Sequence, residues 1–272
     1  MSVTLEFQGP DALPLDLAGV TPAALAGRSV RDIEHLPIVI GNRQAPLAEA
    51  FRVRRTTDDG PLVVTGRLEH VRNLGAAMTS GELRVEGSPG AGCGRRMAGG
   101  ALRVAGDVGD DAGQALRGGL LHVQGNAGDR LAAASPGAWR GMTGGEVLVE
   151  GRAGHDCGTR MRRGLIAVRG GAGCGLGARM LAGTIYVGGP CGPDPGAGMH
   201  RGTLGLWGPE PPRLPSTFRY CGAVDLPMLP LLAARLAAWG MRWQPPPTGP
   251  VALYLGDFLG LGRGEIMVRA PA

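Results

Sequence analysis

Seven short segments of the chain repeat one alternation of aliphatic and other residues. Each reads Gly-x-aliphatic-x-aliphatic-x-Gly, from Gly81–Gly87 to Gly202–Gly208. The aliphatic pairs are Leu83/Val85, Leu102/Val104, Leu121/Val123, Val147/Val149, Ile166/Val168, Ile185/Val187 and Leu204/Leu206. A period of two predicts a strand that buries one side and exposes the other. We therefore expect seven equivalent β-strands.

These segments recur at a fixed spacing. Successive opening glycines are 19 residues apart, except between the third and fourth, where the segment 130–140 accommodates seven extra residues. A constant period of this size indicates a solenoid. A glycine pair such as Gly87 and Gly90 follows each of the first six strands, and we interpret it as a corner where glycine adopts positive φ.

A third column holds a long apolar residue three positions before each opening glycine. Its members are Met78, Met97, Leu116, Met142, Met161, Met180 and Met199. Methionine fills irregular interior space well, so this column predicts core packing and no metal or cofactor role.

The pattern predicts an all-β protein, in the form of a right-handed parallel β-helix built as a single-stranded solenoid of 19-residue rungs. At about 4.8 Å per rung, seven rungs make a core roughly 30 to 35 Å long. The open ends of such a stack need caps. We expect an N-terminal cap with irregular strands over 1–59, the β-helix over 60–208, and a C-terminal region over 209–272 with a capping helix at Leu226–Trp239.

Composition supports a repeat and narrows the choice of partners. The 50 glycines are regularly spaced, which argues against disorder. All basic residues are arginines, and they are too scattered for a nucleic-acid footprint despite a net charge of +5. No apolar run is long enough to span a membrane and no leader is visible, so we expect a cytoplasmic protein. The five cysteines form no CxxC pair and are expected to be reduced packing residues.

No motif of the sequence predicts a catalytic or metal site. The five histidines lack HxH or HExxH spacing and are expected to be solvated loop residues. His155, Asp156 and Cys157 are consecutive, a placement that rarely brings three side chains to one substrate atom. The acidic residues of the strands are interrupted by apolar ones, which indicates a solvated face and no catalytic cleft. Aspartates in the segment 107–111 are expected to form a turn.

Arg96, Arg160 and Arg179 occupy one position of the repeat, directly before the methionine. Stacked rungs would align them into a basic strip. Two interpretations stay open: ordinary solubilising surface, or a strip that holds an acidic tail or the carboxylates of a partner through charge-assisted hydrogen bonds.

The corners and the Met-x-x-Gly-x-aliphatic-x-Val-x-Gly rungs resemble the C subunit of formylmethanofuran dehydrogenase, whose fold is shared with the carboxy-terminal domain of the glutamate synthase large subunit. The tail segments Tyr254–Asp257 and Gly262–Ile266 look like the closing motif of those C subunits. The resemblance covers about 60–268. A glutamate-synthase-type domain is the closer competitor within this fold.

In archaea, that family belongs to a molybdenum or tungsten enzyme that reduces carbon dioxide to formylmethanofuran. In methylotrophic bacteria, related subunits form a formyltransferase/hydrolase complex, which transfers formyl from tetrahydromethanopterin to a methanofuran-type carrier and hydrolyses it to formate. The lysine-free composition favours the bacterial complex.

The resemblance implies that this chain is a scaffold without catalytic residues or a cofactor of its own. Its partners would be an amidohydrolase-like subunit, a formyltransferase subunit and a molybdopterin-subunit homologue, with any metal on a partner. The carrier's tail is glutamate-rich in this family, so the arginine strip could contact it. The segment 130–140 is expected to be a docking loop, because insertions in repeat proteins often lie on the binding face.

The sequence leaves two alternatives open. The first is the C subunit of a molybdenum or tungsten formylmethanofuran dehydrogenase. The second is a stand-alone β-helical enzyme acting on polysaccharides, which predicts a cleft lined by carboxylates.

Overall fold

The computed structural model describes residues 2–9, 13–56, 60–241 and 249–269. Strands dominate it, and the expectation of an all-β protein is confirmed in that sense. The seven predicted strands are all present, as β8 (Glu82–Glu86), β9 (Ala101–Val104), β10 (Leu120–Val123), β11 (Glu146–Val149), β12 (Leu165–Val168), β13 (Thr184–Val187) and β14 (Arg201–Leu206).

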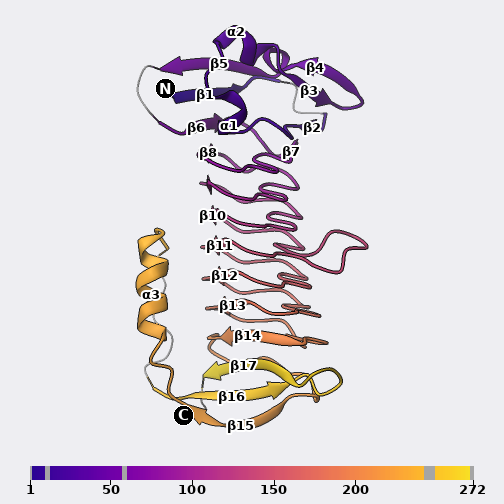
Figure 1. The fold of residues 1–272 in the computed structure, drawn as a ribbon, viewed down its shortest axis with the longest axis vertical. Coiled ribbons are helices and arrows are strands. Elements are labelled where there is room, and N and C mark those ends of the chain that lie inside the picture. Colours follow the sequence, from indigo (N-terminus) through magenta and orange to yellow (C-terminus); the bar gives the residue numbers. More distant parts are fainter. Residues whose placement is uncertain (1, 10–12, 57–59, 242–248, 270–272) are drawn as a thin grey trace.

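These strands form a parallel ladder in which equivalent residues face each other. Leu83 lies opposite Leu102 in β8 and β9, and Ile185 lies opposite Leu204 in β13 and β14. A second line of parallel bridges joins the loops, from Val108 and Ala127 to Ala172 and Cys191. Each strand with its following loop, called a rung from here on, therefore touches the next rung at two places, and the rungs stack along the long axis (Figure 1).

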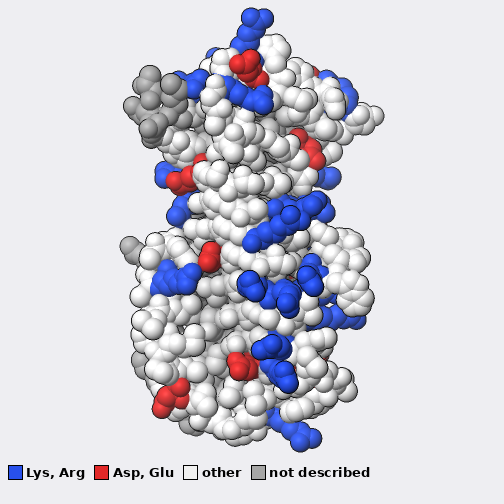
Figure 2. All heavy atoms as spheres, in the orientation of Figure 1, with Lys and Arg blue, Asp and Glu red and all other residues white. Residues whose placement is uncertain are grey.

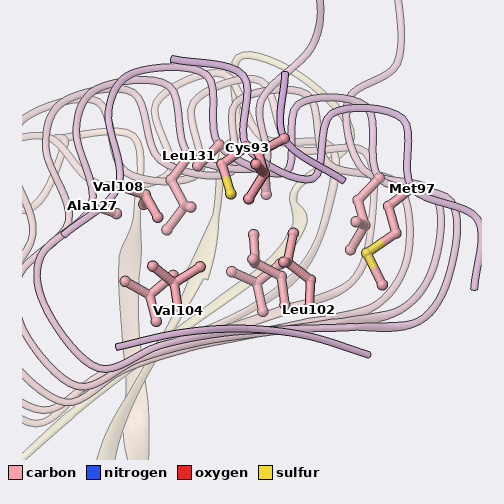
Figure 3. Packing of buried hydrophobic residues seen from close by; sticks show 14 of the residues in the cluster. Cys93, Met97, Leu102, Val104, Val108, Ala127 and Leu131 are labelled. Carbon is pink, nitrogen blue, oxygen red and sulfur yellow. The ribbon is translucent and has the colours of Figure 1, made fainter. Parts of the chain in front are cut away.

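The core lies between the ladder and the returning loops. All seven residues of the methionine column are fully buried, which confirms their predicted packing role. Figure 3 shows Leu102 and Val104 on the strand side, facing Cys93, Val108 and Leu131 of the loops. Burial of one such side chain stabilises the fold by about 1.5–3 kcal/mol.

The expectation that the corner glycines adopt positive φ was wrong for all of them except Gly87, whose φ is 157°. Gly109 does not adopt positive φ, and a Cβ placed on it would lie 2.8 Å from the carbonyl carbon of Gly90 in the rung before. The corners therefore require glycine because successive backbones approach so closely. Positive φ occurs instead at the glycine that opens each strand, such as Gly100 with φ of 80°.

Polar side chains bridge the rungs at the corners. The Ser88 hydroxyl accepts the Asp107 backbone N–H at 3.0 Å, and Asp107 Oδ1 accepts that of Asn126 at 2.6 Å. The Asn126 side-chain oxygen in turn accepts the Arg152 N–H at 2.9 Å. Asp107 was expected only to form a local turn. Instead, its side chain accepts the backbone N–H of Asn126 in the next rung, because the corner backbone supplies no acceptor for that N–H.

The N-terminal region extends the ladder by further strands. β1 (Ser2–Phe7) lies between β5 (Phe51–Thr56), which is antiparallel to it, and β6 (Leu62–Thr65), which is parallel and also pairs with β8. A smaller sheet has the order β4 (Arg43–Pro46), β3 (Pro37–Ile40), β2 (Leu15–Asp16), β7 (Val71–Arg72). The short helices of this region are α1 (Pro22–Leu25), α2 (Val30–Glu34) and the 3-10 helix η1 (Leu47–Glu49).

The C-terminal end of the ladder is closed by strands. β14 pairs in parallel with β17 (Arg263–Arg269), which continues through antiparallel β16 (Val251–Gly256) to β15 (Arg219–Val224). The predicted helix exists as α3 (Leu229–Ala238), yet the expectation that it caps the stack was wrong. Figure 1 shows it beside the ladder, near β10 to β13.

The position of α3 follows from the outward-facing residues of the strands. Leu148 and Ala167 are buried on that face and pack with Leu236 and Met241. On a strand with only one covered face, Leu148 and Ala167 would be exposed to water. Packing of α3 against them buries these apolar side chains, which stabilises the fold. None of the helices in the described residues is long and apolar enough to span a membrane.

Candidate partner-binding groove

The three arginines singled out in the sequence share one backbone conformation. Arg96, Arg160 and Arg179 have φ of 56°, 58° and 53°, in the left-handed region that side chains other than glycine enter only at a cost. Arg160 and Arg179 lie on successive rungs, and both line one cavity. Arg96 does not line it, because the two rungs that separate Arg96 from Arg160, the first of which has Ala115, carry no arginine at this position.

The cavity has a volume of about 730 Å³ and lies between the insertion and the C-terminal loop. Its walls include Trp139 from the insertion, Leu181 and His200 from the bends before two strands, and Leu259 from the loop before β17. The side chains of Trp139 and Leu259 are 82% and 86% exposed. Large apolar side chains beside arginines are typical of an interaction site.

The insertion positions Arg160. The guanidinium Nη1 donates a hydrogen bond to the Ala138 carbonyl at 2.6 Å, and its central carbon lies 5.5 Å from the Trp139 ring centroid. The arginine is thus held between a carbonyl and an aromatic face, an arrangement that fixes a flexible side chain. The seven extra residues are 135–141, since Ala134 and Met142 match Ala115 and Leu116 of the preceding rung.

Asp257 organises the opposite wall. One carboxylate oxygen accepts the Gly198 N–H and the other the Leu259 N–H, both at 2.9 Å. Burial raises the pKa of this carboxyl, but the backbone N–H groups of Leu259 and Gly198 and the Thr217 side chain together outweigh that effect and hold the pKa below its usual range. The ionised Asp257 carboxylate therefore stabilises the conformation of the loop that carries Leu259.

His122 corrects the expectation that the histidines are solvated. Its side chain is 6% exposed, next to the C-terminal end of α3. Arg103 Nη1 lies 3.2 Å from His122 Nδ1 and also donates to the Trp239 carbonyl, while His122 Nε2 lies 3.3 Å from Glu150 Oε1. Burial lowers the pKa of His122, opposed by Glu150 and reinforced by the Arg103 charge. A neutral imidazole that donates to Glu150 satisfies both contacts.

Glu150 also departs from the expected solvated face. Its side chain is 15% exposed and lies between His122 and Arg169, with an ion-pair distance of 3.3 Å to the Arg169 guanidinium. This polar group joins the outer face of the strands to the end of α3.

The sequence triplet at 155–157 is not brought together as a catalytic group. Cys157 points into the core, and burial raises the pKa of its thiol to about 12. His155 is exposed and its Nδ1 accepts the Cys174 N–H at 3.1 Å. Within the described ranges, no cluster of three or more His, Cys, Asp or Glu side chains could hold a metal ion.

Sequence reasoning missed Trp139, His200 and the loop at Asp257 as parts of one groove. The sequence did carry one signal, because Trp139 is one of only four tryptophans and lies in the only break of the 19-residue spacing. No sequence signal places the C-terminal loop beside the insertion, since that requires the return of β17 alongside β14.

No protein-family model matches the chain. Over 87 residues it is 38% identical to the C subunit of the formyltransferase/hydrolase complex Fhc from Methylorubrum extorquens, covering 32% of this chain and 32% of that protein. Over 80 residues it is 32% identical to the C subunit of the tungsten-containing formylmethanofuran dehydrogenase 2 from Methanothermobacter wolfeii, covering 28% of this chain and 30% of that protein. These alignments span about a third of either relative.

The similarity in structure is more extensive. A chain in the crystal structure of the formyltransferase/hydrolase complex from Methylorubrum extorquens, in complex with methylofuran, matches with a TM-score of 0.86 and 36% identity, over 98% of this chain and 100% of that one. Since the whole compared chain is matched and the sequence relatives are C subunits of both enzyme types, this chain belongs to the family of C subunits of formyltransferase/hydrolase complexes and formylmethanofuran dehydrogenases.

Proposed function

We propose that this chain is a non-catalytic scaffold subunit of a formyltransferase/hydrolase complex in one-carbon metabolism. That complex would transfer formyl from tetrahydromethanopterin to a methanofuran-type carrier and hydrolyse it to formate. The observation that carries the proposal is the full-length match to a chain of such a complex.

We infer that the fold is a right-handed parallel β-helix, with an N-terminal cap over 1–59, the helix over 60–208 and a C-terminal region over 209–272. The in-register ladder and the second line of bridges between loops support this description. A rod stabilised along its whole length is suited to a scaffold, because it presents long faces that change little on binding.

The polar side chains of the rungs support a structural role. Asp107, Asn126 and Asp129 all accept backbone N–H groups of the next rung. The buried thiol of Cys157 is held in its neutral form. The side chains of Asp107, Asn126 and Asp129 therefore stabilise the stacking of the rungs. We assign the catalytic steps to the partner subunits.

The partners in this proposal are an amidohydrolase-like subunit that carries the metal, a formyltransferase subunit and a molybdopterin-subunit homologue, all in the cytoplasm. The methanofuran-type carrier would bind to the assembly and no cofactor to this chain alone. Of the three arginines first considered, Arg160 and Arg179 share the groove, and we propose that they contact carboxylates of the carrier tail or of a partner. Arg96 lies apart from them and would act separately.

The test is purification of the tagged chain from its native host, with mass spectrometry of the co-purifying subunits and metal analysis of the eluate. Recovery of a formyltransferase and an amidohydrolase-like subunit, without molybdenum or tungsten, is the expected result. A chain that purifies without partners would contradict the proposal.

The alternative within the family is the C subunit of a molybdenum or tungsten formylmethanofuran dehydrogenase, and the similarity to the enzyme from Methanothermobacter wolfeii favours it. Its signature in the same experiment is a molybdopterin subunit and iron–sulfur proteins in the eluate, together with molybdenum or tungsten.

A further inference from the structure

The chain segments that lead into the seven strands carry arginines and no acidic residues. The bends that lead into the seven strands are the segments 75–80, 94–99, 113–118, 132–144, 158–163, 177–182 and 196–201. They contain nine of the 28 basic residues and none of the 23 acidic ones. The basic band, as we call these nine arginines, consists of Arg95, Arg96, Arg117, Arg140, Arg160, Arg162, Arg163, Arg179 and Arg201.

The bends lie directly on top of one another, which makes the band continuous along the stack. The Arg117 N–H donates to the Met97 carbonyl of the rung before at 2.8 Å, and the Arg162 N–H donates to the Met142 carbonyl at the same distance. Figure 2 shows several groups of basic side chains spaced along the length of one face, with a few acidic side chains beside them. The nine arginines occupy six of the seven bends, so at about 4.8 Å per rung the band is roughly 24 Å long.

The arginines of the band are mostly exposed and form no ion pair with any described residue. Seven of them are exposed, whereas Arg95 and Arg160 are partly buried. Among the residues that the structure describes, none of the nine is within ion-pair distance of a carboxylate, although Arg130 on a neighbouring part of the rung pairs with Asp110 and Asp111. Like charges aligned at this spacing repel each other, and an anionic surface would relieve that repulsion.

Local geometry adds to this argument. Arg96, Arg160 and Arg179 adopt left-handed φ at a position that Gly198 occupies in another rung and that Ala77 and Ala115 occupy in two more, also with left-handed φ. A glycine would adopt that conformation without steric cost, so the arginine side chains are present despite a backbone preference against them.

The groove at one end of the band indicates what kind of partner fits. Arg160 and Arg179 belong both to the band and to the cavity, whose lining also includes Trp139 and Leu259 and the two aspartates Asp194 and Asp257. Exposed apolar side chains within a basic surface suit a protein partner, which can bury an apolar anchor and surround it with carboxylates. A band roughly 24 Å long is also compatible with a standard protein interface, which buries about 800 Å² per partner.

We propose that the basic band is a protein-docking surface, which binds an acidic surface of a partner subunit and seats one apolar side chain of that subunit between Trp139 and Leu259. This inference rests on the proposed function for the existence of partner subunits, and it adds which face they occupy. Carboxylate–guanidinium pairs would form along the band, with bidentate geometry where the partner allows it.

The test uses charge reversal in the assembly purified from the native host. The band variant is Arg117→Glu/Arg162→Glu/Arg163→Glu, at three exposed positions with ordinary φ. The matched control is Arg31→Glu/Arg52→Glu/Arg72→Glu, with the same change of net charge at exposed positions of the N-terminal region. Thermal unfolding of both variants verifies that each chain is folded.

The band variant is expected to retain roughly tenfold less of at least one partner subunit at 0.15 M salt, because like charges then face each other across the interface. The control variant should retain partners as the wild type does. Wild-type retention should also fall with rising salt, since exposed charges are screened.

Arginine-selective labelling with phenylglyoxal provides a second measurement on the same samples. Band arginines should be labelled several-fold less in the wild-type assembly than in the chain separated from it. Equal partner retention by both variants, together with unprotected band arginines, would overturn the inference and leave the proposed function intact. Protection that disappears on nuclease treatment would also overturn it, in favour of a nucleic acid. A wild-type chain without partners would contradict both proposals.

Discussion

At the scale of single residues, close approach of backbones decides the glycine content. Gly109 and its equivalents lie where a side chain would overlap the rung before, and Gly100 combines this close approach with positive φ. The buried side chain of His122 is tolerated because each of its ring nitrogens has a partner. Substitutions at the closely packed glycines and at His122 should therefore change the free energy of unfolding substantially.

Gly109→Ala is expected to lower the free energy of unfolding by about 2–3 kcal/mol, because the added methyl would meet backbone atoms of Gly90 and Ala91 that cannot move aside. Gly260→Ala is the control, since its Cβ would have only ordinary contacts at 3.7 Å or more and should change stability by about 0.5 kcal/mol at most. Denaturant unfolding measures both. Similar costs for the two variants would contradict the steric explanation.

His122 should make stability depend on pH. Because burial lowers its pKa from the ordinary 6.5, the unfolded chain binds a proton at a higher pH than the folded chain does. Stability contributed by the neutral imidazole is therefore complete above about pH 6.5 and declines as the pH falls below it.

His122→Gln keeps one donor and one acceptor but does not titrate. Between pH 7.5 and 5.5, the unfolding free energy of the wild type should fall by up to about 1 kcal/mol more than that of the variant. Equal declines in both proteins, measured by denaturant unfolding, would show that His122 does not cause the pH dependence.

At the scale of elements, the strands form where the alternating pattern predicts them. The position of α3 depends on apolar residues at strand positions that the pattern predicts to face outward. Leu148, Ala167 and Tyr186 occupy outward positions of β11, β12 and β13 and are buried, whereas Arg84 occupies the same position in β8 and is exposed. The apolar character of these positions increases toward the part of the ladder that α3 covers.

Leu236→Ala is expected to destabilise the protein by about 2–4 kcal/mol, because Leu236 is fully buried against Leu148 and Ala167. Leu231→Ala, on the same helix but 75% exposed, should change stability by about 0.5 kcal/mol at most. Hydrogen exchange of α3 should accelerate in the first variant alone. Unchanged exchange in Leu236→Ala would contradict the docking of α3 by this contact.

The elements were largely predictable because their causes are local and repeated. The alternation around Leu102 and Val104 fixes a strand wherever it occurs, and the 19-residue period fixes its neighbours. The location of α3 was not predictable, because it depends on which apolar residues the strands leave uncovered. The groove at Trp139 depends on the return of the tail beside β14. The strip of Arg96, Arg160 and Arg179 was seen, although the rung of Ala115 interrupts it.

At the scale of the whole molecule, the stack should tolerate changes that preserve its period. Removal of residues 135–141 restores 19-residue spacing between β10 and β11. The shortened chain is expected to unfold cooperatively with a loss of about 1–2 kcal/mol, mainly from the contacts of Ser135 with Gln114 and of Ala138 with Arg160. Circular dichroism and denaturant unfolding check this. Failure to fold would mean that the insertion is part of the core.

The measurement that tests the central claim most directly is formate release by the assembly that co-purifies with this chain. With formyl-tetrahydromethanopterin as the formyl donor, the eluate should release formate and the isolated chain should release none. Formate release by the isolated chain would contradict the claim that it is a scaffold, and an assembly without formyl-transfer activity would contradict its assignment to a formyltransferase/hydrolase complex.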